Sequence, residues 1–513
     1  MGSVELGAVV AHTLAALGVT DVVLGAGSRN APLSIAFHAL DADGGPRLHV
    51  AIDERSAGFL ALGLAKGGER LAAVAVTSGS AVANLHPAVL EARHTGAPLL
   101  VLTADRPMEL VGTGASQTAD QVGIFGPATL ACVRVSSESG GPAAWSAAVQ
   151  RAAHLALGTR TREPGPVQVN LEFTPPLVGH TATPDVHVSR VTPSHPGAPV
   201  ALEGQRRTVL VAGDATPAEG ARARALAEDA RIPLLAEPTS NARAGQCAIP
   251  HHRELLATDL ADEIERVIVV GHPTLSRPQT ALLARDDVEL VVVTPRATWH
   301  DTGHRAALVA DAVTLPPQDE AWLCRWQDAD AALADEPTWS GRALARTVLE
   351  TLGADDNLVL GASNLIRDAD LAPVHPTPPT TYANRGQAGI DGTIATARGI
   401  ALATGRPTTV LVGDLTAQHD VGSLVRPPLE PRASLRVVVG DDGGGALFHT
   451  LEQGRPAYAD AFERVFGTPQ GVDLAAVATA LGWRAAVATT VAELRDALAG
   501  PAEFVVARYP RPA

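Results

Sequence analysis

The amino-acid sequence predicts an α/β protein with three domains, each built on a mainly parallel sheet flanked by helices. Short apolar, β-rich runs alternate with helical patterns along most of the chain, which is typical of parallel sheets covered on both faces. A chain of 513 residues exceeds what a single hydrophobic core usually holds. The composition, with 46% hydrophobic and 19% charged residues, is that of a well-packed globular protein.

The first domain is expected at residues 1–180. Its strands are predicted in VTDVVLGAG, PRLHVAID, LAAVAVTSG, PLLVLTAD and PVQVNLEF, with helices such as RSAGFLALGLAK between them. Buried parallel strands read as continuous apolar runs of this kind. The polar, proline-containing stretch 181–205 then predicts an extended linker.

Two further domains follow the linker. A central α/β domain is expected at 206–335, with strands in RRTVLVAGD, IPLLAE, RVIVVGH and VELVVVT. The last domain is expected at 341–513, with strands in NLVLGAS, TTYANRG, PTTVLVGD, LRVVVGDD and EFVVARY. The alternation of these strands with helical patterns again predicts parallel sheets.

Bulk charge and cysteine content argue against several functional classes. A formal net charge of −15 and a pI near 5.6 argue against nucleic acid as a partner. No apolar run reaches the ~18 residues of a membrane span, and the N-terminus lacks the basic region of a signal peptide. Cys132, Cys247 and Cys324 form no CxxC pair, and their odd number suits a reducing compartment. We therefore expect a cytoplasmic protein without a membrane span.

The strongest chemical pattern lies in the last domain, where two consecutive strands end in acidic residues. TTVLVGD ends at Asp414, and LRVVV is followed by Gly440-Asp441 and the glycine run 443–445. Carboxyl ends of parallel strands share one edge, so both carboxylates are expected to hold a divalent cation there, together with a glycine carbonyl. The glycines and the expected helix start at ALFHTLEQG suit a diphosphate. The alternative for either cluster alone is ordinary turn chemistry.

Gly413-Asp414 followed by the acidic, glycine-rich cluster resembles the signature of thiamine-diphosphate enzymes, which is usually Gly-Asp-Gly and later Asn-Asn. Leu415 replaces the third residue of that motif, and Asp441 stands where asparagine is usual. The resemblance implies the three-domain architecture of those enzymes and a thiamine diphosphate bound through Mg²⁺, with Mn²⁺ as a substitute. The metal ligands that it implies are Asp414, Asp441 and the carbonyl of Gly443. It also implies that Leu415 and Gly444 contact the cofactor.

Glu54 follows the predicted strand LHVAID and begins a predicted helix. A carboxylate at that position is usually a helix-capping or dipole residue. The same resemblance instead implies that Glu54 is the catalytic glutamate, which hydrogen-bonds the aminopyrimidine ring so that the cofactor acts as its own base. TSGSAVANLHPAVLEA likewise resembles the turn beside the pyrimidine, which implies cofactor contacts from Ser78, Gly79 and Asn84.

Several longer segments resemble one family, the 2-succinyl-5-enolpyruvyl-6-hydroxy-3-cyclohexene-1-carboxylate synthases, hereafter the synthase family. They are GSRNAPLSIAF, DERSAGFLALGLAK, LTADRP, GASQTADQ, GASNLIRDAD and NRGQAGIDGTIATA. The resemblance implies decarboxylation of 2-oxoglutarate on thiamine diphosphate and 1,4-addition of the succinyl unit to isochorismate, in menaquinone biosynthesis. Both substrates carry two carboxylates, which arginines bind well.

Matching positions carry over the family's substrate-binding residues as Ser28, Arg29, Arg106, Gln117, Ser363, Arg367 and Arg385. Any single arginine is often only a solvated ion pair. Leu447 and Phe448 are expected to wall the substrate pocket, and Ile390 to wedge between the two cofactor rings, with core packing as the alternative for all three.

The superfamily resemblance also implies a homodimer with shared active sites, and further a homotetramer, because Glu54 and Asp414 fall in different domains. Three alternative functions remain open from the sequence. One is another thiamine-diphosphate 2-oxo-acid decarboxylase or carboligase. LGAGSRNAP prompts a dinucleotide-dependent oxidoreductase, although Asn30 stands where that fingerprint needs glycine. The third is a non-catalytic relative.

Overall fold

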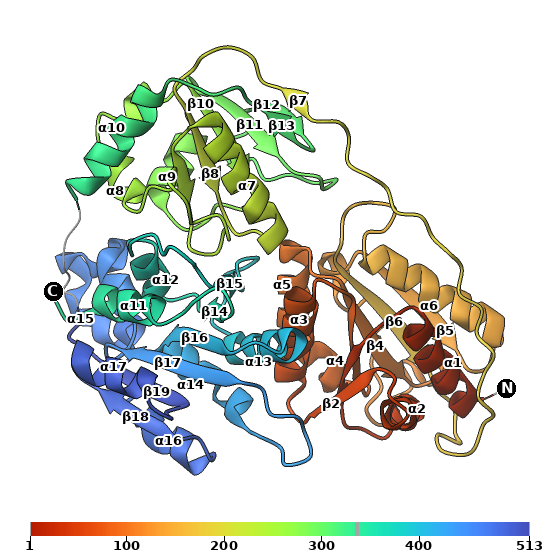
Figure 1. Ribbon diagram of the computed structural model, residues 1–513. Helices are drawn as coiled ribbons and strands as arrows, with labels where there is room; N and C mark the ends of the chain where they lie inside the picture. Colours follow the sequence, from red (N-terminus) through yellow and green to blue (C-terminus); the bar gives the residue numbers. More distant parts are fainter. Residues whose placement is uncertain (1, 334–337, 512–513) are drawn as a thin grey trace. The chain divides into compact units, whose positions relative to one another are not determined.

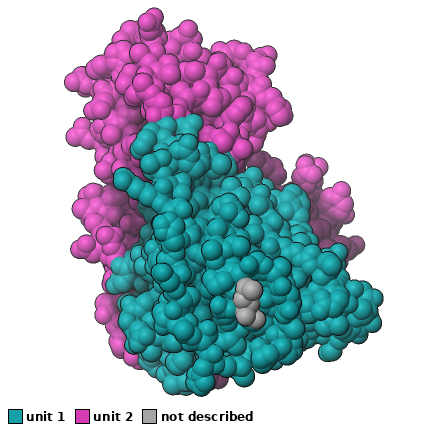
Figure 2. All heavy atoms as spheres, turned by 90° about the vertical axis from the view of Figure 1, so that its right-hand side faces the viewer, with its two compact units in different colours: residues 1–195, 386–405, 420–434 teal, residues 196–385, 406–419, 435–513 magenta. Residues whose placement is uncertain are grey.

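The computed structural model describes residues 2–333 and 338–511, and three parallel sheets organise them (Figure 1). The predicted fold class is confirmed. The chain divides into two compact units, which Figure 2 colours separately. Unit 1 comprises residues 1–195, 386–405 and 420–434, and unit 2 comprises 196–385, 406–419 and 435–513. The three predicted domain ranges stay a prediction, and the expected end of the central domain at residue 335 lies outside the described residues.

The first sheet lies in unit 1 and has the strand order β2-β1-β3-β4-β6-β5, with every pair parallel. Its strands are β1 (Asp21–Gly25), β2 (Arg47–Ala51), β3 (Ala72–Val76), β4 (Leu99–Asp105), β5 (Ala131–Ser136) and β6 (Pro166–Glu172). The main helices of this part are α1 (Ser3–Ala16), α2 (Ala31–Ala42), α3 (Glu54–Gly68), α4 (Ser80–Asn84), α5 (His86–Thr95) and α6 (Pro142–Ala156). All five predicted strands are present, and β5 is additional.

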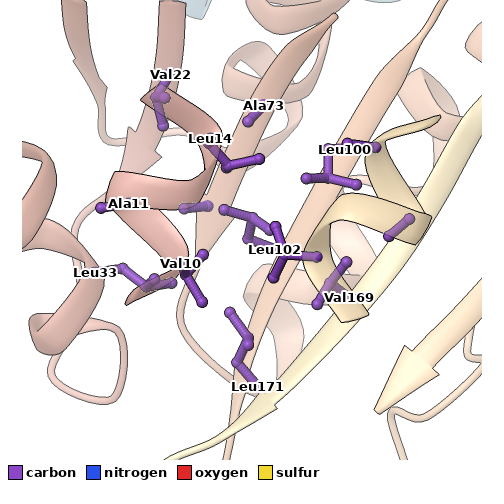
Figure 3. Packing of buried hydrophobic residues seen from close by; sticks show 14 of the residues in the cluster. Val10, Ala11, Leu14, Val22, Leu33, Ala73, Leu100, Leu102, Val169 and Leu171 are labelled. Carbon is purple, nitrogen blue, oxygen red and sulfur yellow. The ribbon is translucent and has the colours of Figure 1, made fainter. Parts of the chain in front are cut away.

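The helices bury both faces of this sheet. In Figure 3, Val10, Ala11 and Leu14 of α1 pack onto strand residues that include Leu100, Leu102 and Val169. The opposite face packs against α3 and α5. Because both faces are covered, the strands read as continuous apolar runs in the sequence.

The second sheet lies in unit 2, in the order β12-β11-β10-β8-β9. Its strands are β8 (Thr208–Ala212), β9 (Leu234–Ala236), β10 (Arg266–Val270), β11 (Glu289–Val293) and β12 (Ala306–Ala310). Its helices are α7 (Pro217–Ala230), α8 (His252–Leu255), α9 (Arg277–Leu283) and α10 (Glu320–Ala331). Within the predicted linker, all of which the structure describes, only β7 (Val200–Ala201) is regular, and it pairs with β13 (Val313–Thr314).

The third sheet, also in unit 2, has the order β15-β14-β16-β17-β19-β18. Its strands are β14 (Asn357–Leu360), β15 (Thr380–Ala383), β16 (Thr408–Gly413), β17 (Leu435–Asp441), β18 (Ala485–Ala488) and β19 (Phe504–Arg508). The α-helices of this part, in chain order, are α11 (Gly341–Glu350), α12 (Asn364–Ala369), α14 (Asp414–His419), α15 (Ala459–Phe462), α16 (Leu474–Ala480) and α17 (Val491–Ala499). All five predicted strands are present, and β18 was not predicted. No helix in the described ranges is both long and apolar enough to cross a bilayer.

Helix α13 (Thr393–Thr404) belongs to unit 1, where it packs closely along α3. Glycines make that approach possible. A Cβ on Gly63 would lie 2.0 Å from the carbonyl oxygen of Thr396, and one on Gly399 would lie 2.3 Å from the carbonyl oxygen of Leu60. The two helix backbones therefore meet without side chains between them at these points.

Gly63→Ala should consequently destabilise the protein, by about 1–3 kcal/mol, because the new methyl group meets a backbone oxygen that cannot move alone. Gly68→Ala, on the same helix, is the matched control. Its methyl group would meet only the flexible Arg70 side chain, so its effect should stay within about 1 kcal/mol. Urea unfolding of the two variants measures both, and equal effects would contradict the proposed backbone contact.

Candidate active site

Asp414 and Asp441 lie at the same edge of the third sheet, as predicted. Strands β16 and β17 are parallel neighbours with Gly413 paired to Gly440, so the two aspartates follow at the same level. Asp414 begins α14, and its Oδ1 accepts a hydrogen bond from the backbone N–H of Leu415 at 2.8 Å. The strand order reverses between β14 and β16, because β15 lies on one side of β14 and β16 lies on the other. Ligands of open α/β sheets bind at such a switch point.

Asp442, which was not predicted as a site residue, joins this acidic cluster in the structure. Burial and the carboxylate of Asp442 raise the pKa of Asp414 to about 7, and Asp442 has a larger effect than Asp441. Burial also raises the pKa of Asp442 to about 6, although the Arg511 guanidinium opposes that shift. A signal was present in the sequence, because Asp442 immediately precedes the first glycine of the run.

The glycine run adopts conformations that favour glycine. Gly443 has φ of 79° and Gly444 has φ of 131°. The N–H of Gly443 donates to Oδ1 of Asp441 at 3.1 Å, and a Cβ on Gly444 would lie 2.1 Å from the carbonyl oxygen of Gly467. Arg511 donates to the carbonyl oxygens of Asp442 and Gly443.

The helix expected after these glycines is not an α-helix, and that expectation is wrong. Ala446–Thr450 forms a 3₁₀ helix, followed by a second short one at Glu452–Gly454. The N–H of Gly445 bonds instead to the carbonyl oxygen of Gly467, and Phe448 packs against Phe466 with ring centroids 5.7 Å apart. Leu447 is partly exposed beside it. Any diphosphate contact here therefore comes from the loop rather than from a long helix dipole.

This edge fits a hard divalent cation bound to a diphosphate. Asp414, Asp441 and Asp442 offer oxygen donors only, and their shared burial disfavours three uncompensated negative charges. Within residues 2–333 and 338–511, no three His, Cys, Asp or Glu side chains form a group that could hold a metal ion by themselves. Magnesium usually takes only one or two carboxylates and completes its shell with phosphate oxygens and water.

Three predicted substrate-binding residues gather at the same edge of unit 2. Ser363 caps α12 and lies next to Gly413, where an added Cβ would meet its Cβ at 3.2 Å. Arg367, on α12, donates to the carbonyl oxygen of Ser363 at 3.3 Å. Burial and the nearby Arg385 lower the pKa of Arg367. The two guanidinium groups therefore lie close enough for their positive charges to interact.

Unit 1 places Glu54 at the carboxyl edge of the first sheet. Asp53 caps α3 by accepting the N–H of Arg55 at 3.0 Å, which fixes Glu54 as the first helical residue. Glu54 Oε2 accepts a hydrogen bond from Nδ2 of Asn84 at 3.2 Å. This contact joins two of the predicted cofactor-binding residues. A Cβ on Gly25 would lie 3.4 Å from Cγ of Glu54, so the end of β1 adjoins the glutamate.

A second cluster at this edge unites Ser78, Arg106 and Gln117. Arg106 donates to Oγ of Ser78 and, at 2.9 Å, to the carbonyl oxygen of Gln117. Gln117 Nε2 donates to the carbonyl oxygen of Ser78 at 2.9 Å. Gly79 has φ of 84°, and its N–H donates to Oε1 of Gln121 at 3.3 Å. Gln121 is a supporting residue that was not predicted from the sequence, although it ends the segment GASQTADQ.

Arg29 adjoins this cluster, since burial and the charge of Arg106 lower the pKa of its guanidinium. Its Nη1 donates to the carbonyl oxygen of Phe173 at 2.6 Å. Ser28, which precedes Arg29 in the loop between β1 and α2, is exposed. Ile390 is partly exposed in the segment 386–405 of unit 1, and Leu415 is partly exposed in unit 2.

Comparison with known proteins agrees with this geometry. A family model described as "Thiamine pyrophosphate enzyme, N-terminal TPP binding domain" matches residues 4–124. The fold and this match define the protein class as a thiamine-diphosphate-dependent enzyme.

Curated relatives identify the family within that class. The 2-succinyl-5-enolpyruvyl-6-hydroxy-3-cyclohexene-1-carboxylate synthase of Kineococcus radiotolerans is 49% identical over 97% of this chain and 93% of its own length. Those of a Nocardioides species and of Paenarthrobacter aurescens are each 45% identical over 94% of this chain, and over 90% and 89% of their own lengths. The chain therefore belongs to the synthase family and is a transferase. The family predicted from the sequence is confirmed.

The raised pKa of Asp414 makes the stability of the metal-free protein dependent on pH. The pKa of Asp414 is about 7 in the folded protein, against an ordinary value of 3.8, so protonation of Asp414 stabilises the folded protein. This stabilisation is complete below pH 3.8 and is lost as the pH rises through 7. A pKa that differs by one between the folded and the unfolded protein corresponds to about 1.4 kcal/mol. Asp414→Asn should therefore lose less stability than the wild type as the pH rises from about 4 to about 7.

Thermal unfolding with a chelator present measures this difference. Asp229→Asn, which changes an exposed aspartate of the same unit, should follow the wild-type curve. A parallel pH dependence in the wild type and Asp414→Asn would contradict the raised pKa assigned to Asp414.

Proposed function

We propose that this protein decarboxylates 2-oxoglutarate and adds the remaining succinyl unit to isochorismate by 1,4-addition. The products are 2-succinyl-5-enolpyruvyl-6-hydroxy-3-cyclohexene-1-carboxylate and CO₂. The observation that carries the proposal is the similarity to synthases of that name over nearly the whole chain, at up to 49% identity. The step belongs to menaquinone biosynthesis, and we place the protein in the cytoplasm.

In this proposal, Asp414, Asp441 and the Gly443 carbonyl hold Mg²⁺, which Mn²⁺ can replace, and the glycine loop receives the diphosphate. Asp442, whose charge also raises the pKa of Asp414, lies next to this ligand set. Thiamine diphosphate, when bound, supplies the nucleophilic carbon and stabilises the charge left by decarboxylation. Glu54 holds a proton at the aminopyrimidine ring, with Asn84 fixing the orientation of its carboxylate.

Two arginine groups suit two substrates that each carry two carboxylates. Arg29 and Arg106 form one group, together with Ser78 and Gln117. The other consists of Arg367 and Arg385, with Ser363 adjacent. A partly buried guanidinium binds a carboxylate more strongly than an exposed one because less water screens the pair.

We further propose a homodimer whose active sites are shared, with Glu54 and Asp414 of each site coming from different subunits, and assembly of dimers into a homotetramer. Glu54 and its hydrogen-bond donor Asn84 lie in unit 1, Asp414 lies in unit 2, and Asn84 is exposed in the single chain. A partly exposed Glu54 beside an exposed Asn84 is expected where a second subunit completes the site.

The two-substrate assay tests the proposed reaction. With thiamine diphosphate and Mg²⁺ present, 2-oxoglutarate and isochorismate should disappear in equal amounts, with one CO₂ released for each pair consumed. Steady release of CO₂ and succinic semialdehyde at the same rate without isochorismate would indicate a simple decarboxylase and contradict the proposal.

Complementation between two inactive variants tests the shared sites. Glu54→Gln should bind the cofactor but lose at least about 100-fold in turnover, whereas Asp414→Ala should lose calorimetric binding of Mg²⁺-thiamine diphosphate. Co-expression of the two variants should restore about a quarter of wild-type activity, because half of the dimers are mixed and each mixed dimer has one intact site.

If each site is built within one chain, co-expression restores nothing, and the shared-site proposal fails. A doubly substituted chain, Glu54→Gln with Asp414→Ala, co-expressed with the wild type is the matched control. Its mixed dimers have two half-altered sites and should add no activity beyond that of the wild-type dimers.

A further inference from the structure

Arg385 is almost completely buried, at 6% exposure, and its guanidinium is held from the second sheet. Its Nη2 donates a hydrogen bond of 2.6 Å to the hydroxyl oxygen of Thr274. Its Nε is buried and has no hydrogen-bond partner among the described residues. Thr274 follows β10, so a side chain of the central sheet contacts an arginine that follows β15 of the third sheet. Both residues belong to unit 2.

Thr274 is itself fixed by a buried carboxyl group. Oε1 of Glu237 accepts the N–H groups of Thr274 at 2.9 Å and of Leu275 at 2.7 Å. Glu237 follows β9 and is 1% exposed. Two backbone hydrogen bonds to one oxygen atom hold the turn, and with it the Thr274 hydroxyl, in one position.

The strand that carries Arg385 is held from the same sheet. Asn241 exchanges two hydrogen bonds of 2.9 Å with the backbone of Thr381, one to its carbonyl oxygen and one from its N–H. Its side-chain amide thus takes the place of a neighbouring strand along the open edge of β15. An edge strand paired in this way has little freedom to shift.

We propose that Thr274 is a positioning residue that aims the Arg385 guanidinium at a carboxylate of one substrate, and that Glu237 positions Thr274. This inference rests on the proposed function, in which Arg385 binds substrate. A free arginine side chain has about 2 kcal/mol of rotamer entropy to lose on binding. Engaging one guanidinium nitrogen beforehand reduces that loss, because the remaining nitrogens are already oriented.

The experiment compares Thr274→Val with Thr274→Ser. Valine keeps the shape of threonine but lacks the hydroxyl, so KM for one dicarboxylate substrate should rise about 5- to 30-fold, which corresponds to the loss of a positioned hydrogen bond. The other substrate's KM and the Kd for Mg²⁺-thiamine diphosphate should change less than about twofold. Thr274→Ser retains the hydroxyl and should stay close to the wild type.

Thr280→Val is the matched control, because its hydroxyl bonds to the nearby Ser276 carbonyl oxygen, at 3.1 Å, on its own helix. It should leave both KM values unchanged. An unchanged KM in Thr274→Val overturns the inference, and so does an equal loss in Thr274→Ser. A rise in both KM values together with the cofactor Kd also overturns it, since that pattern indicates general damage. Inactive wild-type protein would instead refute the proposed function.

Glu237 is tested separately with Glu237→Gln and Glu237→Ala. Burial raises the pKa of Glu237 to about 8, against the charge of Arg385, so the neutral form predominates at pH 7 and glutamine approximates its shape and charge. Glu237→Gln should therefore keep KM within about threefold of the wild type. Glu237→Ala should raise the same KM as Thr274→Val, and the double variant should show no additional rise. Additive effects would overturn the link between the two residues, and if Glu237→Ala does not fold, the Thr274 comparison still decides the proposal.

Discussion

The arrangement of functional residues depends on one constraint, the parallel orientation of every strand pair in the three large sheets. Parallel strands need crossover helices that cover both faces of the sheet, so the faces are closed to ligands and only the strand ends are open. Loops after β1 to β4 bring Arg29, Glu54, Ser78 and Arg106 to one edge. Loops after β14 to β17 likewise bring Ser363, Arg367, Arg385, Asp414 and Asp441 to one edge of the third sheet. The topology of the sheets therefore decides where the predicted site residues lie, before any side-chain detail is considered.

The same constraint creates an electrostatic problem at the end of β17. Asp414, Asp441 and Asp442 share a partly buried edge, and burial raises the pKa of Asp414 and of Asp442. Arg511 lies against the loop and donates to two of its carbonyl oxygens, while its Nη1 pairs with Glu463 at 2.7 Å. Arg508 Nε also lies 3.5 Å from Oδ2 of Asp441, and a divalent cation between the carboxylates would compensate them more directly than these arginines do. Aspartate at position 441, where asparagine is usual in the superfamily, is therefore compatible with a metal site.

The sequence predicted most of the fold because buried parallel strands leave a strong signal. The three strands of the large sheets that it missed, β5, β12 and β18, are all edge strands with partly exposed side chains. Their mixed burial leaves no continuous apolar run to detect. At the candidate site, motifs predicted Glu54 and Asp414, and both lie at the carboxyl edge of their sheets. Asp442 was missed although it lies next to the glycine run, because its effect on Asp414 depends on how the backbone turns after Asp441.

The central sheet shows most clearly what a sequence motif does not reveal. Glu237, Asn241 and Thr274 lie in loops at the carboxyl edge of that sheet, as the proposed substrate-binding residues do in the other two, but they belong to no recognisable motif. Glu237 accepts hydrogen bonds from backbone N–H groups within the central domain. Asn241 and Thr274 contact Thr381 and Arg385, and these two contacts exist only after two sheets have packed together. In the proposed function the central domain thus affects substrate binding, because it holds the end of β15 and the Arg385 guanidinium. The rigidity of Arg385 is then a property of unit 2 as a whole, and its loop alone could not provide it.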